Sequence, residues 1–192
     1  MIFVIDTSSA VSSLAILDEA MAVRQEVFLP ARSPELMDRM RALAAGATLT
    51  KVAVATGPGS FTGLRMGVSF GLGLAVGLRI PIVPLPTLDL QAARSDTPAI
   101  AVSEAGRGRV YYLVPGGKPS LGEPEEIPKT HSLVGSVAPA TESSLRKAGH
   151  RFQPESELRT FAEAAAHILK TAREVPYGSL KLEYMQSFSA SK

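Results

Sequence analysis

The chain has 192 residues, 45% of them hydrophobic and 20% charged, a composition that supports a real core and excludes wholesale disorder. It contains no cysteine, which excludes disulfides, thiolate metal sites and cysteine nucleophiles and predicts a reducing, cytoplasmic setting. The net charge is only +2, and no basic run is interleaved with aromatic residues, so tight direct binding of nucleic acid is not expected.

Short apolar runs at the start of the chain predict three successive strands, which short turns make antiparallel: residues 2–5, 14–17 and 21–29. A helix should follow, because Ser33 can cap it and Pro34 suits its first turn. A buried strand at 52–55 should then run directly into a glycine-rich loop and a second helix.

The most apolar part of that second helix is 66–78, between two arginines. A helix of this length spans about 20 Å, less than the roughly 30 Å of a bilayer core. We therefore expect a buried helix and no membrane contact.

Beyond residue 79 the pattern predicts strands at 80–85, 99–102, 110–114 and 133–138, helices at 87–94 and 160–172, and a loop-rich stretch at 115–130. The last helix has the clearest start signal, because Thr160 and Glu163 have the spacing of a capping box.

The loop from Gly57 to Gly63 follows a strand and precedes a helix, the position at which backbone amides can bind phosphate. It has neither the lysine of a Walker loop after Gly63 nor the glycine at position 62 that a dinucleotide fingerprint requires. Two interpretations stay open: a phosphate site, or a tight turn in which Ser60 caps the helix. Ser60 is not in a Gly-x-Ser-x-Gly motif, so it is not expected to be a nucleophile.

Glycines recur every four residues within the second helix, at Gly63, Gly67 and Gly71 and again at Gly73 and Gly77. Each costs helix stability, on the order of 1 kcal/mol relative to alanine. Two compensations stay open, close packing on the protein's own sheet and close packing across a subunit interface.

Asp6 and Thr7 follow the first strand, where actin-like ATPases carry Asp-x-Gly-Thr/Ser; Ser8 takes the place of that glycine here, which favours a plain turn. Near the end of a later strand, Glu104, Arg107 and Arg109 are expected to be solvated, with contact to a ligand as the alternative, and contact with tRNA stays open for the two arginines. The histidines at 131, 150 and 167 lack metal-ligand spacing, so no metal site is expected.

Three stretches together resemble the bacterial TsaB (YeaZ) family: FVIDTSS at 3–9, ATGPGSFTGLRMG at 55–67 and GLAVGLRIPIVPLPTLD at 73–89. The chain departs from the family pattern at Arg32, where a histidine is usual, and at Glu104, where an aspartate is usual. The resemblance implies an α/β fold of the actin/Hsp70-like (ASKHA) type. Its two lobes of mixed sheet flanked by helices would be residues 1–103 and a shortened second lobe, 104–192.

The resemblance also implies a non-catalytic scaffold in the synthesis of threonylcarbamoyladenosine on tRNA. The implied partners are a TsaD-type catalytic subunit and a TsaE-type ATPase, with a homodimer when the chain is alone and tRNA contacted only through the complex. No cofactor is expected on this chain, whereas ATP and a metal are expected on the partners, and the sequence lacks the His-x-x-x-His metal site of the catalytic relative. The alternative is an independent actin-fold phosphotransferase or a glycoprotease-like peptidase.

No catalytic residue is expected. The expected partner interface lies on the first two helices and comprises Leu36, Met37, Met40, Leu43, Arg65, Gly67 and Gly71. A vestigial nucleotide loop is expected at Asp6, Thr7, Gly57, Gly59 and Ser60.

Overall fold

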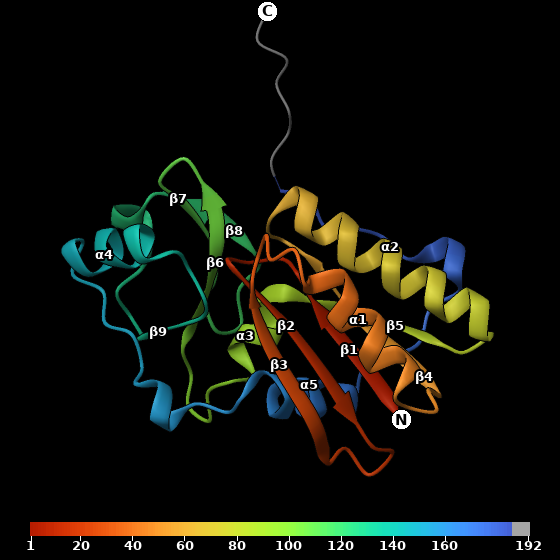
Figure 1. Cartoon of the computed structure of the whole chain (residues 1–192). Coiled ribbons are helices and arrows are strands. Elements are labelled where there is room, and N and C mark those ends of the chain that lie inside the picture. Colours follow the sequence, from red (N-terminus) through yellow and green to blue (C-terminus); the bar gives the residue numbers. More distant parts are fainter. Residues whose placement is uncertain (186–192) are drawn as a thin grey trace, which may run out of the picture.

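A computed structural model describes residues 1–185, which form two sheets flanked by helices (Figure 1). The first sheet has the strand order β3-β2-β1-β4-β5. Its strands are β1 (Ile2–Asp6), β2 (Val11–Leu17), β3 (Val23–Pro30), β4 (Lys51–Gly57) and β5 (Ile82–Pro86). Strand β1 pairs antiparallel with β2 and parallel with β4, and β2 pairs antiparallel with β3, which confirms the three antiparallel strands expected at the start of the chain.

The second sheet has the order β8-β7-β6-β9. Its strands are β6 (Ile100–Gly106), β7 (Arg109–Leu113), β8 (Ser120–Gly122) and β9 (Leu133–Val134). Two expectations are corrected here. Strand β8 lies inside the stretch expected to be loop, where it pairs with β7, and β9 has two residues in place of the expected strand at 133–138.

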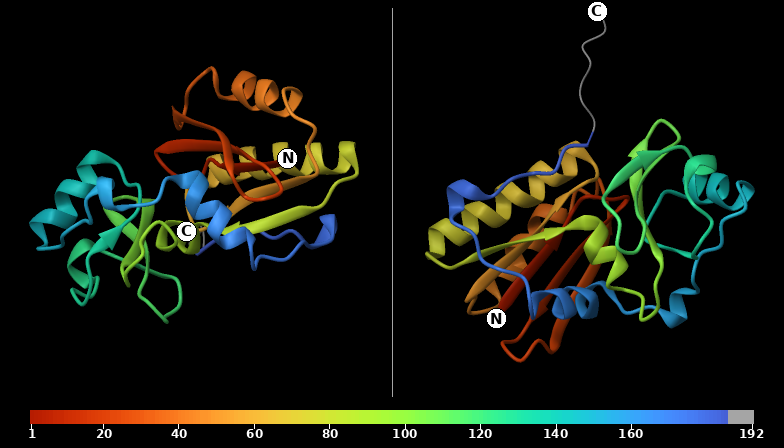
Figure 2. Two further views of the ribbon diagram at one scale, coloured as in Figure 1. Left: turned by 90° about the horizontal axis from the view of Figure 1, so that it is seen from below. Right: turned by 180° about the vertical axis from the view of Figure 1, so that it is seen from behind.

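Helices cover both faces of the first sheet, as the two views in Figure 2 show. α1 (Leu36–Ala45) and α2 (Phe61–Leu78) share one face, and α5 (Phe161–Leu169) covers the other. α3 (Thr87–Ala92) contacts both β6 and β7 of the second sheet. The remaining helical elements are α4 (Pro139–Lys147) and the short turns η1 (Pro124–Glu126), η2 (Glu155–Glu157) and η3 (Tyr177–Ser179).

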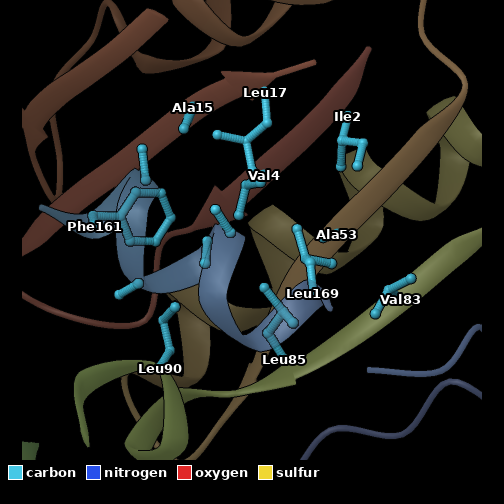
Figure 3. Close-up of a cluster of buried hydrophobic side chains, with 14 residues drawn as sticks. Ile2, Val4, Ala15, Leu17, Ala53, Val83, Leu85, Leu90, Phe161 and Leu169 are labelled. Atoms are coloured by element: carbon cyan, nitrogen blue, oxygen red, sulfur yellow. The ribbon is translucent and has the colours of Figure 1, made fainter. Parts of the chain in front are cut away.

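The α5 side of the first sheet is a closely packed apolar cluster (Figure 3). Phe161 and Leu169 point from α5 toward the sheet, where Val4 and Leu17 are fully buried. The predicted capping box starts this helix: the Thr160 hydroxyl accepts from the Glu163 amide at 3.3 Å, and the Glu163 carboxylate accepts from the Thr160 amide at 2.8 Å.

The start of α2 is as predicted, but that of α1 is not. Ser60 caps α2, its hydroxyl accepting from the Gly63 amide at 3.3 Å. Ser33 accepts from the Glu35 amide in a turn, and the helix begins only at Leu36.

Because α2 begins at Phe61, it has 18 residues, and the length argument against a membrane span is wrong. By length and composition alone it could cross a bilayer, with a mean hydropathy of 1.4, and no other helix among residues 1–185 passes that test. A single such helix is weak support for a membrane, because core helices of folded proteins pass the same test. Five of its residues are buried in the protein's own core. The absence of membrane contact stays a prediction.

The C-terminal part of the chain returns to the first sheet. α5 packs on it, Val175 forms a bridge with Ile82 of β5, and the Glu183 amide donates to the Thr56 carbonyl at 2.8 Å. Strand β6 runs across the expected boundary at residue 103. The division into 1–103 and 104–192 therefore stays a prediction, with residues 186–192 outside the described part.

Candidate functional site

The expected nucleotide loop is assembled at the ends of β1 and β4. Because these strands are parallel neighbours, the turn at Asp6 and Thr7 meets the loop from Gly57 to Ser60. The Ser60 amide donates to the Ser8 carbonyl at 2.7 Å, and the Thr7 hydroxyl donates to the Gly63 carbonyl at 2.7 Å. The structure thus brings together all five residues expected in this loop.

A nucleotide phosphate does not fit this loop as it is folded. A Cβ on Gly59 would meet the Ser8 carbonyl, and one on Gly63 would meet the Thr7 carbonyl, so backbone fills the space that a phosphate would need. The amides of Ser8, Ser60 and Gly63 are already engaged within the protein. The glycines here allow two turns to touch, and the nucleotide role stays a prediction that this geometry does not support.

Asp6 is 2% exposed, and burial raises the pKa of its carboxyl group above the ordinary value. A hydrogen bond from the Ser8 amide to Oδ1, 2.8 Å long, acts in the opposite direction by stabilising the carboxylate. Asp6 therefore closes a turn in the core, with no water-exposed surface for a ligand.

The two positions that depart from the family pattern lie in one hollow of about 370 Å³ between the lobes. Its lining comprises Arg32, residues 59–61, residues 104–106, Tyr111 and residues 183–185. Sequence reasoning did not bring Arg32 and Glu104 together, because Arg32 lies in the turn after β3 and Glu104 lies in β6 of the other sheet, and no spacing rule connects them.

Glu104 was expected to be solvated, and this is corrected: its carboxylate is part-buried and bonded to the start of α4. One carboxylate oxygen accepts from the Thr141 hydroxyl at 3.0 Å, and the other accepts from the Ala138 amide at 3.1 Å. A carboxylate at a helix N-terminus satisfies free amides and interacts favourably with the helix dipole. Sequence analysis missed α4, although Pro139 at its first turn was a usable signal.

The expected interface residues on α1 face the protein's own core. Leu36, Met40 and Leu43 are buried against the first sheet, whereas Met37 is only partly buried. Helical spacing identified the apolar face correctly, but that face packs on the sheet. This corrects the expectation that these three side chains meet a partner.

Gly67 and Gly71 also face inward. A Cβ on Gly67 would collide with the Thr7 hydroxyl, and one on Gly71 would collide with the Val54 side chain. Close packing on the sheet therefore compensates for the helix stability that Gly67 and Gly71 cost. These two residues are not available to a partner.

The second glycine series faces solvent. Ser69, Gly73, Val76 and Gly77 are all exposed on one side of α2, and a Cβ on Gly73 or Gly77 would meet no described residue within 4 Å. We call these four residues the outer face of α2. Its small side chains would let another backbone approach closely.

Arg65, also expected at the interface, is exposed near the start of α2. Its guanidinium lies 3.9 Å from the centroid of the Phe61 ring, and its Nε donates to the Tyr184 hydroxyl at 3.2 Å. It holds the C-terminal segment beside the helix, and its contact with a partner stays a prediction.

The metal site and the tRNA contact were both subjects of sequence predictions, and both remain predictions. Within residues 1–185, no group of three or more His, Asp or Glu side chains is arranged to hold a metal ion. The expectation that the chain binds no metal nevertheless stays a prediction. Arg107 and Arg109 flank the β6–β7 turn, and their contact with tRNA is likewise untested.

The sequence matches a family model described as TsaD, tRNA N6-adenosine threonylcarbamoyltransferase, over residues 35–168. It is 33% identical to the "tRNA threonylcarbamoyladenosine biosynthesis protein TsaB" of Bacillus subtilis over 120 residues, covering 57% of this chain and 52% of the relative. It is 36% identical to the Escherichia coli protein of the same name over 75 residues, covering 35% of this chain and 32% of the relative. The matched part thus spans about half of the first relative and about a third of the second.

Solved structures agree on the fold. "YeaZ from Pseudomonas aeruginosa" superposes with a TM-score of 0.68 at 19% identity, covering 96% of this chain and 99% of that one. A second structure, described as "an uncharacterized protein with similarity to peptidase YEAZ from Pseudomonas aeruginosa", gives a TM-score of 0.71 at 21% identity, with the same coverage. The actin/Hsp70-like α/β fold is therefore confirmed. The chain belongs to the family that the TsaD model describes, and within that family its motifs and its curated matches are of the TsaB (YeaZ) type.

Proposed function

We propose that this chain is a non-catalytic scaffold in the synthesis of threonylcarbamoyladenosine on tRNA, docking a TsaD-type catalytic subunit through the outer face of α2. The relatives it resembles are named as biosynthesis proteins of this nucleoside. The proposed setting is the cytoplasm.

The observation that carries this proposal is the unpartnered outer face of α2. Gly73 and Gly77 cost helix stability and, unlike Gly67 and Gly71, meet no group within residues 1–185 that would explain them. Val76, on the same side, is 48% exposed. An apolar helix face of small residues is suited to another helix at close range.

A TsaD-type subunit is the proposed occupant because this chain itself matches the TsaD family model over a range that includes both α1 and α2. The partner should therefore carry an equivalent helix pair, and two such pairs can meet in a pseudo-twofold arrangement. In the absence of that partner, the same face would pair with its own copy in a homodimer.

The chemistry is assigned to the partners. The loop at Gly59 is closed to phosphate by the Ser8 carbonyl, and the sequence has no His-x-x-x-His pair. ATP, a metal and the acceptor adenosine of tRNA would be bound mainly by the TsaD-type and TsaE-type subunits.

Reconstitution tests the proposal: threonylcarbamoyladenosine is measured on tRNA with the two partner subunits, in the presence and absence of this chain. Modification should require the chain, and the isolated chain should give no heat of binding with Mg-ATP. Equal modification without it, or turnover of substrate by the chain alone, would contradict the scaffold role and favour the actin-fold enzyme.

A further inference from the structure

A hollow of about 300 Å³ lies on the second lobe, formed by two segments that precede β9 and follow α4. Its lining comprises Lys129, Thr130, His131, Ser132, Gly149, His150 and Arg151. Four of these seven residues are basic or imidazole-bearing and two carry hydroxyl groups. No acidic side chain lines the hollow in the part of the chain that the structure describes.

The two segments are fixed to each other by hydrogen bonds and do not simply happen to be close. Leu133 donates its amide to the Arg151 carbonyl at 2.8 Å, and the Gln153 amide donates to the Leu133 carbonyl at 2.9 Å. The His150 amide donates to the Leu145 carbonyl at the end of α4. The hollow is therefore part of the folded lobe.

The charges at its mouth are not neutralised within the protein. Lys129 and Arg151 are exposed, and neither forms an ion pair within 4.0 Å anywhere in residues 1–185. The Lys129 ammonium lies beside the Gly149 turn, 3.4 Å from where a Cβ on that glycine would be. Two free cations beside a hydroxyl-lined hollow suit a phosphate group.

His150 adds a second, independent feature. It is 5% exposed, its Nε2 lies 2.8 Å from the Pro124 carbonyl, and its Nδ1 has no partner among the described residues. Because a carbonyl can only accept, Nε2 donates to Pro124, and within residues 1–185 Nδ1 is left as a buried polar atom without a partner at the wall of the hollow.

We propose that this hollow binds a backbone phosphate of RNA, with Lys129 and Arg151 contacting the phosphate oxygens. The inference rests on the proposed function, which supplies tRNA as the RNA, and it adds a direct contact where only an indirect one was expected. Figure 1 shows α4 and β9 at the opposite end of the molecule from α2, so this contact and docking through α2 are compatible.

The test uses two double variants. The first combines Lys129→Glu and Arg151→Glu, and the control combines Lys118→Glu and Arg173→Glu. All four side chains are exposed, and both variants lower the net charge equally. Binding of fluorescently labelled tRNA to the full-length chain is measured across a series of salt concentrations. The first variant should bind at least tenfold more weakly, with a salt dependence reduced by about one phosphate contact, while the control should lose less than threefold.

Three results would overturn the inference. They are equal losses in both variants, unchanged affinity in both, and saturable binding of inorganic phosphate that depends on Lys129 and Arg151 while tRNA affinity does not. Complex formation with the TsaD-type subunit is measured on the same proteins. If the wild type fails to form the complex, the scaffold proposal fails, whereas an intact complex with unchanged tRNA affinity rejects the phosphate site alone.

Discussion

The two sides of α2 carry the same glycine spacing but have opposite environments. Gly67 and Gly71 lie against β1 and β4, where no Cβ would fit, whereas Gly73 and Gly77 have open space around them. A glycine repeat in a sequence therefore identifies a helix built for close approach, but not what approaches it. Gly67 and Gly71 therefore serve packing within the protein, whereas Gly73 and Gly77 are available to a partner.

The largest effect should come from Gly71→Leu, which forces a side chain into Val54 and Val52 of β4. Overpacking a core of this density should lower the free energy of unfolding by about 3 kcal/mol. Urea denaturation measures it, with Gly73→Leu as the matched control. The control should match or exceed the wild type, because leucine is the better helix former by about 1 kcal/mol. Equal stability of the two variants would remove the distinction between the two sides.

Gly73→Leu should instead weaken self-association of the isolated chain. A leucine on the outer face would hold a second copy away, and we expect at least a tenfold rise in the dimer dissociation constant, about 1.4 kcal/mol. Analytical ultracentrifugation measures it. Ala140→Leu, an exposed leucine added on α4, should leave the constant unchanged; if it has the same effect as Gly73→Leu, the outer face is not the contact.

A smaller effect is expected from Tyr177→Phe at the C-terminal end of α2. The Tyr177 hydroxyl lies 2.8 Å from the Ile80 carbonyl and 3.3 Å from that of Ala75, so it ties the returning segment to the helix end. Removing it should cost about 1 kcal/mol of stability and speed amide exchange in residues 175–185. Tyr184→Phe is the comparison, because the Tyr184 hydroxyl accepts from the exposed Arg65 side chain, and its loss should cost less.

The smallest effect is expected at Asp6, beneath the packed side of α2. Because burial raises its pKa in the folded state, the folded protein holds this proton more tightly than the unfolded chain does. Stability should therefore fall as the pH rises from the ordinary carboxyl value through the raised pKa. Asp6→Asn should flatten this part of the profile and gain relative stability at neutral pH. The free energy of unfolding of the wild type and of Asp6→Asn is measured by urea denaturation between pH 3 and 8. If the two curves run parallel, the carboxylate at Asp6 is not destabilised by burial.

Much of the first lobe could be predicted from the sequence because its signals are local. Short apolar runs predicted the strands of the first sheet, Ser60 as a helix cap was one of two interpretations of its loop, and Thr160 with Glu163 marked the start of α5. The second lobe was harder, because β8 and β9 have only three and two residues and are defined by their pairing partners.

The candidate site shows a different limit. Helical spacing found the apolar faces of α1 and α2, but only the tertiary structure shows that Leu36, Met40 and Leu43 meet the sheet. Arg32 and Glu104 line one hollow, and Lys129 and Arg151 line another, although no local pattern connects the segments that carry them. Such convergence depends on topology, and a single sequence does not display it.

The most direct test of the central claim is the affinity of the wild-type chain and of Gly77→Leu for a purified TsaD-type subunit, measured by isothermal titration. The outer-face account predicts a saturable one-to-one complex that Gly77→Leu weakens at least tenfold without loss of folding stability. Equal affinity of the two proteins, or no complex with the wild type, would contradict docking through this side of α2.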